Sequence, residues 1–304
     1  MVVLGVVLTL LVAILALTVF VAFTGRDRSV VFGRRSTLQF KGASRTYLVT
    51  GQRGSASKPK SLVIALHGFG GDGRQFAYYT ALHNAFPPDV VVAYPDALSP
   101  TRPGLKTGWN AQFCCGSGWK EKADDVGFLR ALIDRLVVEY GVPRDRVFLV
   151  GFSNGAFMAQ RFAAENPTLV RAIAVGSGTI GTLGNSLNPT GPVPILLMHG
   201  AKDQRVRYDG GTSPGDPEFD WIGFNDTVEV WRTTNGCAAD GGAQKGSVVR
   251  TASRVTTAYN ACSVPMKTIE YLNNAHKWDG WRITNVWTRV PGESREVAAF
   301  FAQF

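Results

Sequence analysis

Residues 146–155 read Arg-Val-Phe-Leu-Val-Gly-Phe-Ser-Asn-Gly, and the last five match the pattern G-x-S-x-G. The apolar half is typical of a buried strand, and a helical pattern begins directly after it. A serine between a strand and a helix indicates a sharp turn that raises the hydroxyl above the edge of a sheet. The flanking glycines fit such a turn, because a Cβ there would clash with the crowded backbone. We therefore predict that Ser153 is a nucleophile; the alternative is an ordinary glycine-rich strand-to-helix turn.

Similar apolar runs recur along the chain and alternate with helical patterns. The runs are short and rich in Val, Ile and Leu, which is typical of parallel strands buried on both faces. They lie at 61–66, 89–94, 171–175, 194–199 and 267–272, with helical patterns at 124–140, 155–165 and 293–303. This alternation predicts an α/β fold with a mostly parallel central sheet and helices on both faces. We expect long loops or small insertions at 203–226 and 236–262.

The N-terminus has the pattern of a membrane segment. Residues 2–24 carry no charged side chain, and a helix of this length crosses a hydrocarbon core of about 30 Å. We interpret residues 1–24 as a transmembrane anchor, or alternatively as a signal helix, residues 25–37 as a linker and residues 38–304 as the catalytic domain. Basic residues after the apolar run favour a cytoplasmic domain, whereas the cysteines favour an extracytoplasmic one, which we expect.

The net charge of +9 constrains the partners. The Lys and Arg residues are scattered, and no basic stripe alternates with aromatic residues, so we expect no nucleic-acid partner. A solvated basic surface is the simplest interpretation, and attraction to an anionic wall or membrane surface is the alternative. We expect a monomer that contacts the membrane through its N-terminal helix.

A serine hydroxyl needs a base to become a nucleophile, and the chain has only four His. His67 precedes a glycine-rich loop and is interpreted as structural. His83 falls in a predicted surface helix, and His199 ends a buried strand. His276 lies just after the apolar run 267–272, which makes it the predicted base.

The acid should follow the strand at 194–199, and Asp203 comes four residues after that strand. The order Ser153, Asp203, His276 is the order found in hydrolases with this kind of serine turn. The carboxylate would orient the imidazole and stabilise its charged form. Asp209 is the nearest competitor. More distant competitors are Asp216, Asp220 and Asp226.

The negative charge that develops during acyl transfer needs two backbone donors. We predict the N–H of Asn154, which follows the nucleophile, and the N–H of Phe69 in the loop His67-Gly68-Phe69-Gly70-Gly71. Gly70 is the second choice in that loop, and a plain flexible loop is the alternative.

Several motifs in combination resemble one group of secreted esterases. They are L-H-G-F-G-G at 66–71, G-W-N-A-Q-F-C-C-G at 108–116, D-D-V-G-F-L at 124–129, G-F-S-N-G-A-F-M-A at 151–159, H-G-A-K-D-Q-R-V-R-Y-D-G-G at 199–211 and N-G-C at 235–237. The chain resembles polyhydroxybutyrate depolymerases and the feruloyl and acetylxylan esterases of carbohydrate esterase family 1, over about residues 38–304. The resemblance implies an α/β-hydrolase fold, a Ser153–Asp203–His276 triad, action outside the cytoplasm and no metal or organic cofactor.

The segment around His276 departs from that group. Its members have G-G-H-x-W-P-G there, whereas this chain has N-N-A-H-K-W-D-G. The spacing from His276 to Trp278 is retained, but the loop is bulkier and lacks the Pro. The departure therefore affects the expected shape of the pocket, and with it the substrate, and leaves the predicted base in place.

The cysteine and tryptophan residues lead to further expectations. Cys237 and Cys262 flank a loop-rich stretch and are expected to pair in an exported protein. The adjacent Cys114 and Cys115 could form a disulfide or remain thiols, and no spacing indicates a zinc site. We predict Trp278 and Trp109 as substrate-binding rings, with core positions as the alternative for both.

These patterns predict a serine esterase that hydrolyses carboxylic esters through an acyl-enzyme. The expected substrates are feruloyl or acetyl esters of polysaccharide, polyhydroxyalkanoate-type polyesters, or small aromatic or aliphatic esters. One alternative is an envelope acyltransferase of the mycolyltransferase type. Another is a non-catalytic binding protein on the same fold, which the complete set of triad residue types disfavours.

Overall fold

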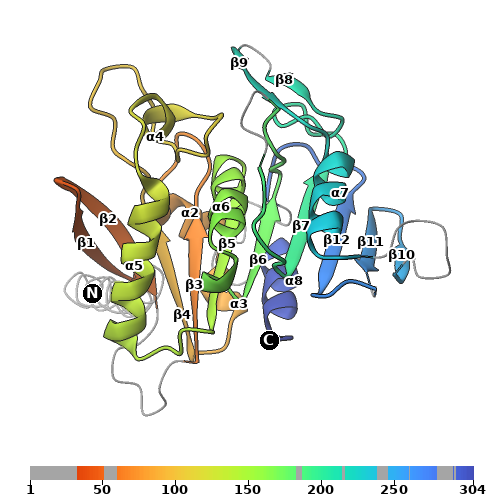
Figure 1. Ribbon diagram of the computed structural model, residues 1–304, viewed down its shortest axis with the longest axis horizontal. Helices are drawn as coiled ribbons and strands as arrows, with labels where there is room; N and C mark the ends of the chain where they lie inside the picture. Colours follow the sequence, from red (N-terminus) through yellow and green to blue (C-terminus); the bar gives the residue numbers. More distant parts are fainter. Residues whose placement is uncertain are drawn as a thin grey trace, which may run out of the picture.

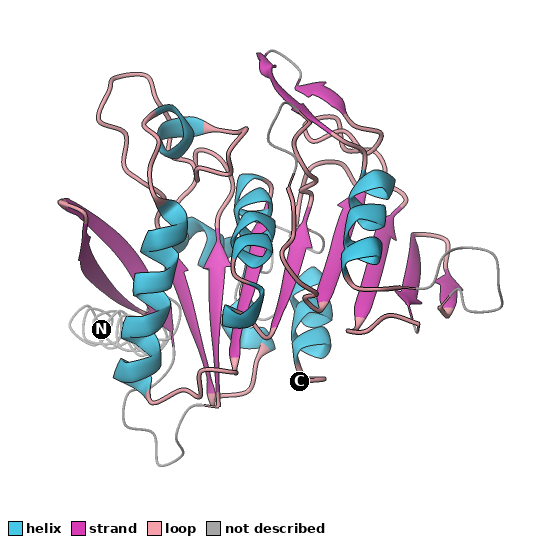
Figure 2. Ribbon diagram, viewed as in Figure 1, coloured by secondary structure: helices cyan, strands magenta, loops and turns pink. Residues whose placement is uncertain are grey.

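One large twisted sheet forms the centre of the molecule (Figures 1 and 2). The computed structural model describes residues 33–50, 60–182, 187–213, 216–237, 246–259, 261–278, 290 and 292–304. Within these residues, ten strands join in the order β1-β2-β4-β3-β5-β6-β7-β12-β11-β10, and β8 and β9 form a separate two-stranded sheet. The apolar run at 1–24 lies outside the described residues. None of the described helices is long and apolar enough to span a membrane.

The strands follow the predicted apolar runs in the middle of the sheet. Their bounds are β1 Arg34–Phe40, β2 Ala43–Thr50, β3 Ser61–Leu66, β4 Val90–Pro95, β5 Val147–Phe152, β6 Ala172–Gly176, β7 Ile195–Gly200, β8 Gly211–Ser213, β9 Asp216–Trp221, β10 Val248–Arg250, β11 Arg254–Tyr259 and β12 Met266–Tyr271. The strands from β4 to β12 in the sheet order run parallel, and the strands outside them pair antiparallel. The prediction of a mostly parallel sheet is confirmed for this central part.

Helices cover both faces of the sheet (Figure 1). The helices are α2 Gly73–Thr80, α3 Leu82–Ala85, α4 Gly116–Lys120, α5 Asp125–Tyr140, α6 Asn154–Glu165, the 3₁₀ turn Pro167–Leu169, α7 Phe224–Thr234 and α8 Gly292–Phe301. Side chains of α5, α6 and α7 share one core with Leu62, Ile64 and Leu66 of β3. Side chains of α2 and α8 share another core with Val63 and Ala65. The alternation along β3 explains why an apolar run without polar breaks marks this strand.

Three segments differ from the sequence prediction. The first strand begins at Arg34, four residues before the expected start of the domain. The long loop or small insertion expected at 236–262 contributes the edge strands β10 and β11, and the one expected at 203–226 contains the β8–β9 hairpin and the start of α7. The side chains of β10 are exposed, and those of β1 alternate between exposed and half-buried. Because edge strands of this kind bury little apolar surface, they lack the pattern that identifies a central strand.

The parallel register brings the carboxyl ends of the strands to one edge. Leu66 lies opposite Gly151, and Gly151 lies opposite Val175. On the other side of β6, Gly200 at the end of β7 lies opposite Tyr271 at the end of β12. The loops after β3, β5, β7 and β12 therefore start at the same edge, which is where an open α/β sheet binds its ligands.

Candidate active site

The turn between β5 and α6 holds Ser153 in a strained backbone conformation. Its φ is 55° and its ψ is −124°, which places a non-glycine residue in a region that such residues rarely adopt. A Cβ at Gly151 would lie 2.1 Å from the carbonyl oxygen of Gly155, and a Cβ at Gly155 would lie 2.2 Å from that of Leu66. Both glycines are therefore required by close backbone approach, as the G-x-S-x-G pattern predicts.

The structure brings the three predicted catalytic side chains together. The Oγ of Ser153 lies 2.9 Å from Nε2 of His276, and Nδ1 of His276 lies 2.7 Å from Oδ2 of Asp203. A carboxylate only accepts hydrogen bonds, so Nδ1–H donates to Asp203 and the unprotonated Nε2 accepts from the serine hydroxyl. This is the arrangement in which an imidazole takes a proton from an attacking serine.

Asp203 is held rigidly in a buried position. Its Oδ1 accepts hydrogen bonds from the backbone N–H groups of Arg205 at 2.9 Å and Val206 at 3.0 Å. Burial by itself would raise the pKa of Asp203, but the hydrogen bond and charge of His276, with smaller contributions from His199 and the Arg205 N–H, lower the pKa below its ordinary value. The carboxylate therefore stays ionised beside the imidazole. The competitor Asp209 is exposed at the surface.

The loop after β3 lies directly against the nucleophile. A Cβ at Gly68 would lie 3.3 Å from the Cβ of Ser153. The N–H of Gly70 donates to the carbonyl of Thr107 at 2.8 Å, so it is already engaged, and that of Gly71 donates to the carbonyl of Gly68. Of the two residues considered in this loop, these bonds favour Phe69 over Gly70 as an oxyanion donor. The Phe69 side chain is 48% exposed.

The second predicted donor, Asn154, is completely buried at the start of α6. Its side chain is fixed by the segment at 108–116. Its Oδ1 accepts from the N–H of Trp109 at 2.6 Å, and its Nδ2 donates to the carbonyls of Trp109 at 3.1 Å and Cys114 at 3.4 Å. The carboxamide thus ties the residue after the nucleophile to a loop forty residues away in the sequence.

The profile of the phospholipase/carboxylesterase family matches residues 53–213, which is more than half of the chain. The matched range contains the Gly68 loop, Ser153 and Asp203. This chain belongs to the phospholipase/carboxylesterase family. Its fold is accordingly the α/β-hydrolase fold, with a mostly parallel central sheet.

The similar proteins of this chain are named as esterases. NocK of Nocardia uniformis subsp. tsuyamanensis, provisionally named an esterase, is 28% identical over 79% of this chain and 72% of its own length. Feruloyl esterase B of Piromyces equi is 26% identical over 61% of this chain, and the match spans only 34% of that enzyme. The solved acetyl xylan esterase of Aspergillus awamori shares the fold, with a TM-score of 0.59, 16% identity and coverage of 89% of this chain and 99% of that one.

The two predicted substrate-binding tryptophans lie in the interior instead. Trp109 is 0% exposed, and its indole N–H donates to the carbonyl of His67 at 3.0 Å. Trp278 is 4% exposed, and its indole N–H donates to Oγ of Ser294 at 2.9 Å. The ring of Trp278 belongs to the core that α2 and α8 share with the sheet, and it lies 6.1 Å from the ring of Phe152, the residue before Ser153. Their burial favours the core positions that were the alternative for both rings.

The other histidines have structural roles. His67 is buried, its Nε2 accepts from the N–H of Ala97 at 3.0 Å, and its Nδ1–H therefore donates to the carbonyl of Gly68 at 2.7 Å. His199 is also buried and lies 3.6 Å from Asp203, with Nε2–H donating to the carbonyl of Val206. Burial lowers the pKa of His199, so it remains neutral beside the triad. Among the described residues no group of His, Cys, Asp and Glu could hold a metal ion.

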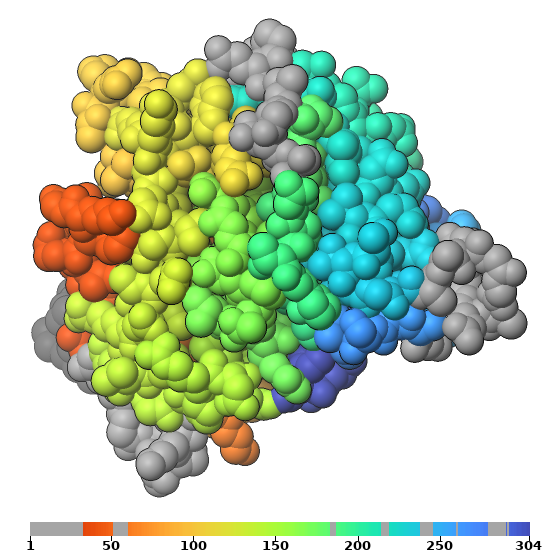
Figure 3. All heavy atoms as spheres, viewed as in Figure 1, coloured from red at the N-terminus to blue at the C-terminus, as the bar shows by residue number. Residues whose placement is uncertain are grey.

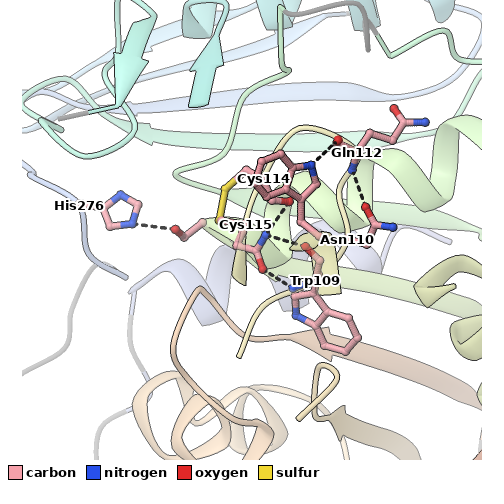
Figure 4. Close-up of a disulfide and its surroundings, with 9 residues drawn as sticks. Trp109, Asn110, Gln112, Cys114, Cys115 and His276 are labelled. Atoms are coloured by element: carbon pink, nitrogen blue, oxygen red, sulfur yellow. Dashed lines mark hydrogen bonds between the residues drawn. A yellow bond between two sulfur atoms is a disulfide. The ribbon is translucent and has the colours of Figure 1, made fainter. Parts of the chain in front are cut away.

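The sequence left the state of Cys114 and Cys115 open, and the structure joins them in a disulfide. In Figure 4 this disulfide extends from the 108–116 segment toward His276. It belongs to an apolar cluster with Phe113, Phe157 and Val206. Phe157 lies one turn after Ser153 and Val206 contacts Asp203, so this cluster borders the triad. The paired cysteines were the only signal for it in the sequence. The expected disulfide between Cys237 and Cys262 is confirmed.

Proposed function

We propose that this chain is a serine esterase that hydrolyses carboxylic esters through an acyl-enzyme. The observation that carries the proposal is the relay from Ser153 through His276 to Asp203, with hydrogen bonds of 2.9 and 2.7 Å. Membership in the phospholipase/carboxylesterase family supports ester hydrolysis as the reaction.

The geometry allows a complete catalytic cycle. Ser153 Oγ attacks the ester carbonyl carbon while Nε2 of His276 takes the hydroxyl proton. The backbone N–H groups of Asn154 and Phe69 stabilise the negative oxygen. The tetrahedral intermediate collapses, the C–O bond to the alcohol breaks, and His276 donates its proton to the leaving alkoxide. Water then attacks the acyl-enzyme with His276 as base, releases the acid and regenerates the Ser153 hydroxyl.

The surroundings of the triad favour an apolar acyl group. An apolar cluster lies beside Ser153 and contains the Cys114–Cys115 disulfide, Phe157 and Val206. Among the substrate classes expected from the sequence, we propose feruloyl or acetyl esters of polysaccharide first and polyhydroxyalkanoate-type esters second. The two disulfides among the described residues fit a protein that works outside the cytoplasm, anchored to the membrane or secreted.

The test is ester turnover by the full 304-residue chain. We would measure kcat/KM for p-nitrophenyl acetate, p-nitrophenyl butyrate and methyl ferulate, in wild type and Ser153→Ala. We expect wild type to hydrolyse at least one ester, and Ser153→Ala to lose on the order of 10⁴-fold or more. The ratio of ferulate to acetate turnover then indicates the acyl group.

Ser253→Ala is the matched control, because Ser253 is exposed on the segment before β11 and is far from Ser153 in the sheet order. It should retain wild-type turnover. Equal activity of Ser153→Ala and wild type would refute the proposed nucleophile. Absence of turnover on all three esters, with the protein folded, would refute the proposed substrate classes.

A further inference from the structure

A cavity of about 440 Å³ lies beside α4. It is lined by Asn110, Gln112, Trp119, Lys120, Lys122 and Arg161. Figure 3 shows the gold and yellow residues around α4 at the upper part of the face that carries α5 and α6. None of these lining residues takes part in the proposed ester hydrolysis, so the cavity needs a separate explanation.

The charges of this cavity are positive. Arg161 is partly neutralised by Glu165 at 2.8 Å and also donates to the carbonyl of Asn110 at 2.5 Å. The same Glu165 carboxylate accepts a hydrogen bond from the side-chain amide of Gln112 at 3.4 Å. Lys120 lies over the ring of Trp119, with its Nζ 4.3 Å from the ring centre. Within the described part of the chain, no carboxylate forms an ion pair with Lys122. The adjacent Glu121 instead accepts hydrogen bonds from Thr101.

The cavity also offers the groups that recognise a saccharide. The Trp119 ring is half-buried and is fixed because its indole N–H donates to the carbonyl of Gln112 at 2.9 Å. The Trp119 ring also packs against Phe219 in a T-shaped contact, with the ring centroids 5.3 Å apart. An ordered aromatic ring provides a flat apolar surface for the C–H face of a sugar, and a nearby amide such as Gln112 can bond to hydroxyl groups.

The position of the cavity links it to the proposed catalytic site. Arg161 lies eight residues after Ser153, which is about 12 Å along α6 at the helical rise of 1.5 Å per residue. The segment that supplies Asn110 and Gln112 also supplies Trp109, which is bonded to Asn154, and the Cys114–Cys115 disulfide (Figure 4). A polymer whose ester lies at Ser153 could therefore reach this cavity with a neighbouring unit.

We propose that this cavity binds a carboxylate-bearing saccharide, such as a uronate unit of an acidic polysaccharide. The carboxylate pairs with Lys122 and with the Arg161 donors that Glu165 and Asn110 leave free. The sugar packs against the part of the Trp119 ring that Lys120 does not cover, and the side-chain oxygen of Gln112 accepts from a hydroxyl. The neutral amides and the ring distinguish this site from a simple cation patch, which would hold any small anion. The binding site goes beyond the proposed hydrolysis and does not depend on it.

The test is calorimetric binding to the full-length protein at low salt, with α-1,4-linked trigalacturonate as the probe. Neutral xylotriose and inorganic phosphate are the comparison ligands. We expect trigalacturonate to bind at least about tenfold more tightly than either, and its affinity to fall as salt is added. Lys122→Asn removes the charge while Asn tolerates the φ of 52° at this position, and we expect at least about tenfold weaker binding.

Arg144→Gln is the control for net charge, because Arg144 is exposed just beyond the far end of α5 and pairs with Asp134. It should bind trigalacturonate like wild type. The inference is wrong if xylotriose or phosphate binds as tightly as trigalacturonate, or if Lys122→Asn and Arg144→Gln bind it equally. Since binding is measured without turnover, an inactive esterase would leave this result unchanged.

Discussion

The carboxamide of Asn154 offers the sharpest test of how the site is held together. Asn154→Ala removes the hydrogen bonds at 2.6 and 3.1 Å to Trp109 and the longer bond to Cys114. Both Asn154 and Trp109 are 0% exposed, so the Trp109 N–H would lose its acceptor in the interior. Each of the two bonds to Trp109 contributes about 1 kcal/mol, and the unpaired N–H costs about 1–2 kcal/mol. We therefore expect the free energy of unfolding to fall by about 3–4 kcal/mol.

The assay is urea denaturation, followed by turnover of the best p-nitrophenyl ester below the unfolding transition. The variant keeps the backbone N–H that we assign to the oxyanion hole, so any loss of kcat reports displacement of that group. We expect kcat to fall at least about tenfold, because small displacements of catalytic groups are costly.

The matched control is the C-cap residue of the same helix, Asn166. Asn166→Ala removes one side-chain bond, to the carbonyl of Phe162 at 3.1 Å, far from Ser153. It should lose about 1 kcal/mol and no activity. If Asn154→Ala were no less stable than Asn166→Ala, the carboxamide would not hold the 108–116 segment. If its kcat were unchanged, the carboxamide would not position the donor.

Three further predictions concern the triad, the second disulfide and a half-buried carboxylate. Asp203→Asn should lower kcat by about 10⁴-fold while the protein stays folded, because an amide no longer selects the required His276 tautomer; a change of less than tenfold would contradict this. Replacing Cys237 and Cys262 by Ala should lower the free energy of unfolding by about 3 kcal/mol, measured by urea denaturation, because their bond closes a loop with a sequence separation of 25. Equal urea midpoints for the variant and wild type would contradict this prediction. Burial raises the pKa of Glu296, but Lys267 and Arg254 outweigh this and hold it below its ordinary value of 4.5. The stability that this carboxylate contributes should therefore be present at neutral pH and be lost as the pH falls through its folded pKa. We expect wild type and Glu296→Gln to differ in urea midpoint at pH 7 and to converge in acid. A difference that stays constant with pH would contradict this prediction.

The sequence predicted the central sheet because its strands are buried on both faces. The runs at 62–66 and 195–198 contain no polar residue, which distinguishes them from loops. The same reasoning missed β1 and β10. Their side chains are largely exposed, so their pairing is determined by neighbouring strands and leaves no hydrophobic pattern in the sequence.

Chain order and strand ends were enough to predict which residues meet at the site. Ser153, Asp203 and His276 each follow a strand of the parallel sheet, and such ends converge at one edge. Side-chain direction was not predictable in the same way. Trp109 and Trp278 are close to the site in sequence, but whether a ring faces the substrate or the core depends on the backbone direction of a loop without periodicity.

The choice between Phe69 and Gly70 also needed the structure. The amino-acid sequence of the loop does not show that the Gly70 N–H donates a hydrogen bond to the carbonyl of Thr107, which lies 37 residues later in the chain. Long-range backbone bonds of this kind depend on how two loops meet.

Covalent labelling of the nucleophile tests the central claim most directly. The full-length protein would be treated with diisopropyl fluorophosphate, in which an activated serine oxygen replaces fluoride at phosphorus, and the peptides would be analysed by mass spectrometry. We predict one diisopropylphosphoryl group on Ser153, loss of esterase activity in proportion to labelling, and no label in Ser153→Ala or in wild type unfolded by urea. Inactivation with Ser153 unlabelled, or label on another serine alone, would contradict the account.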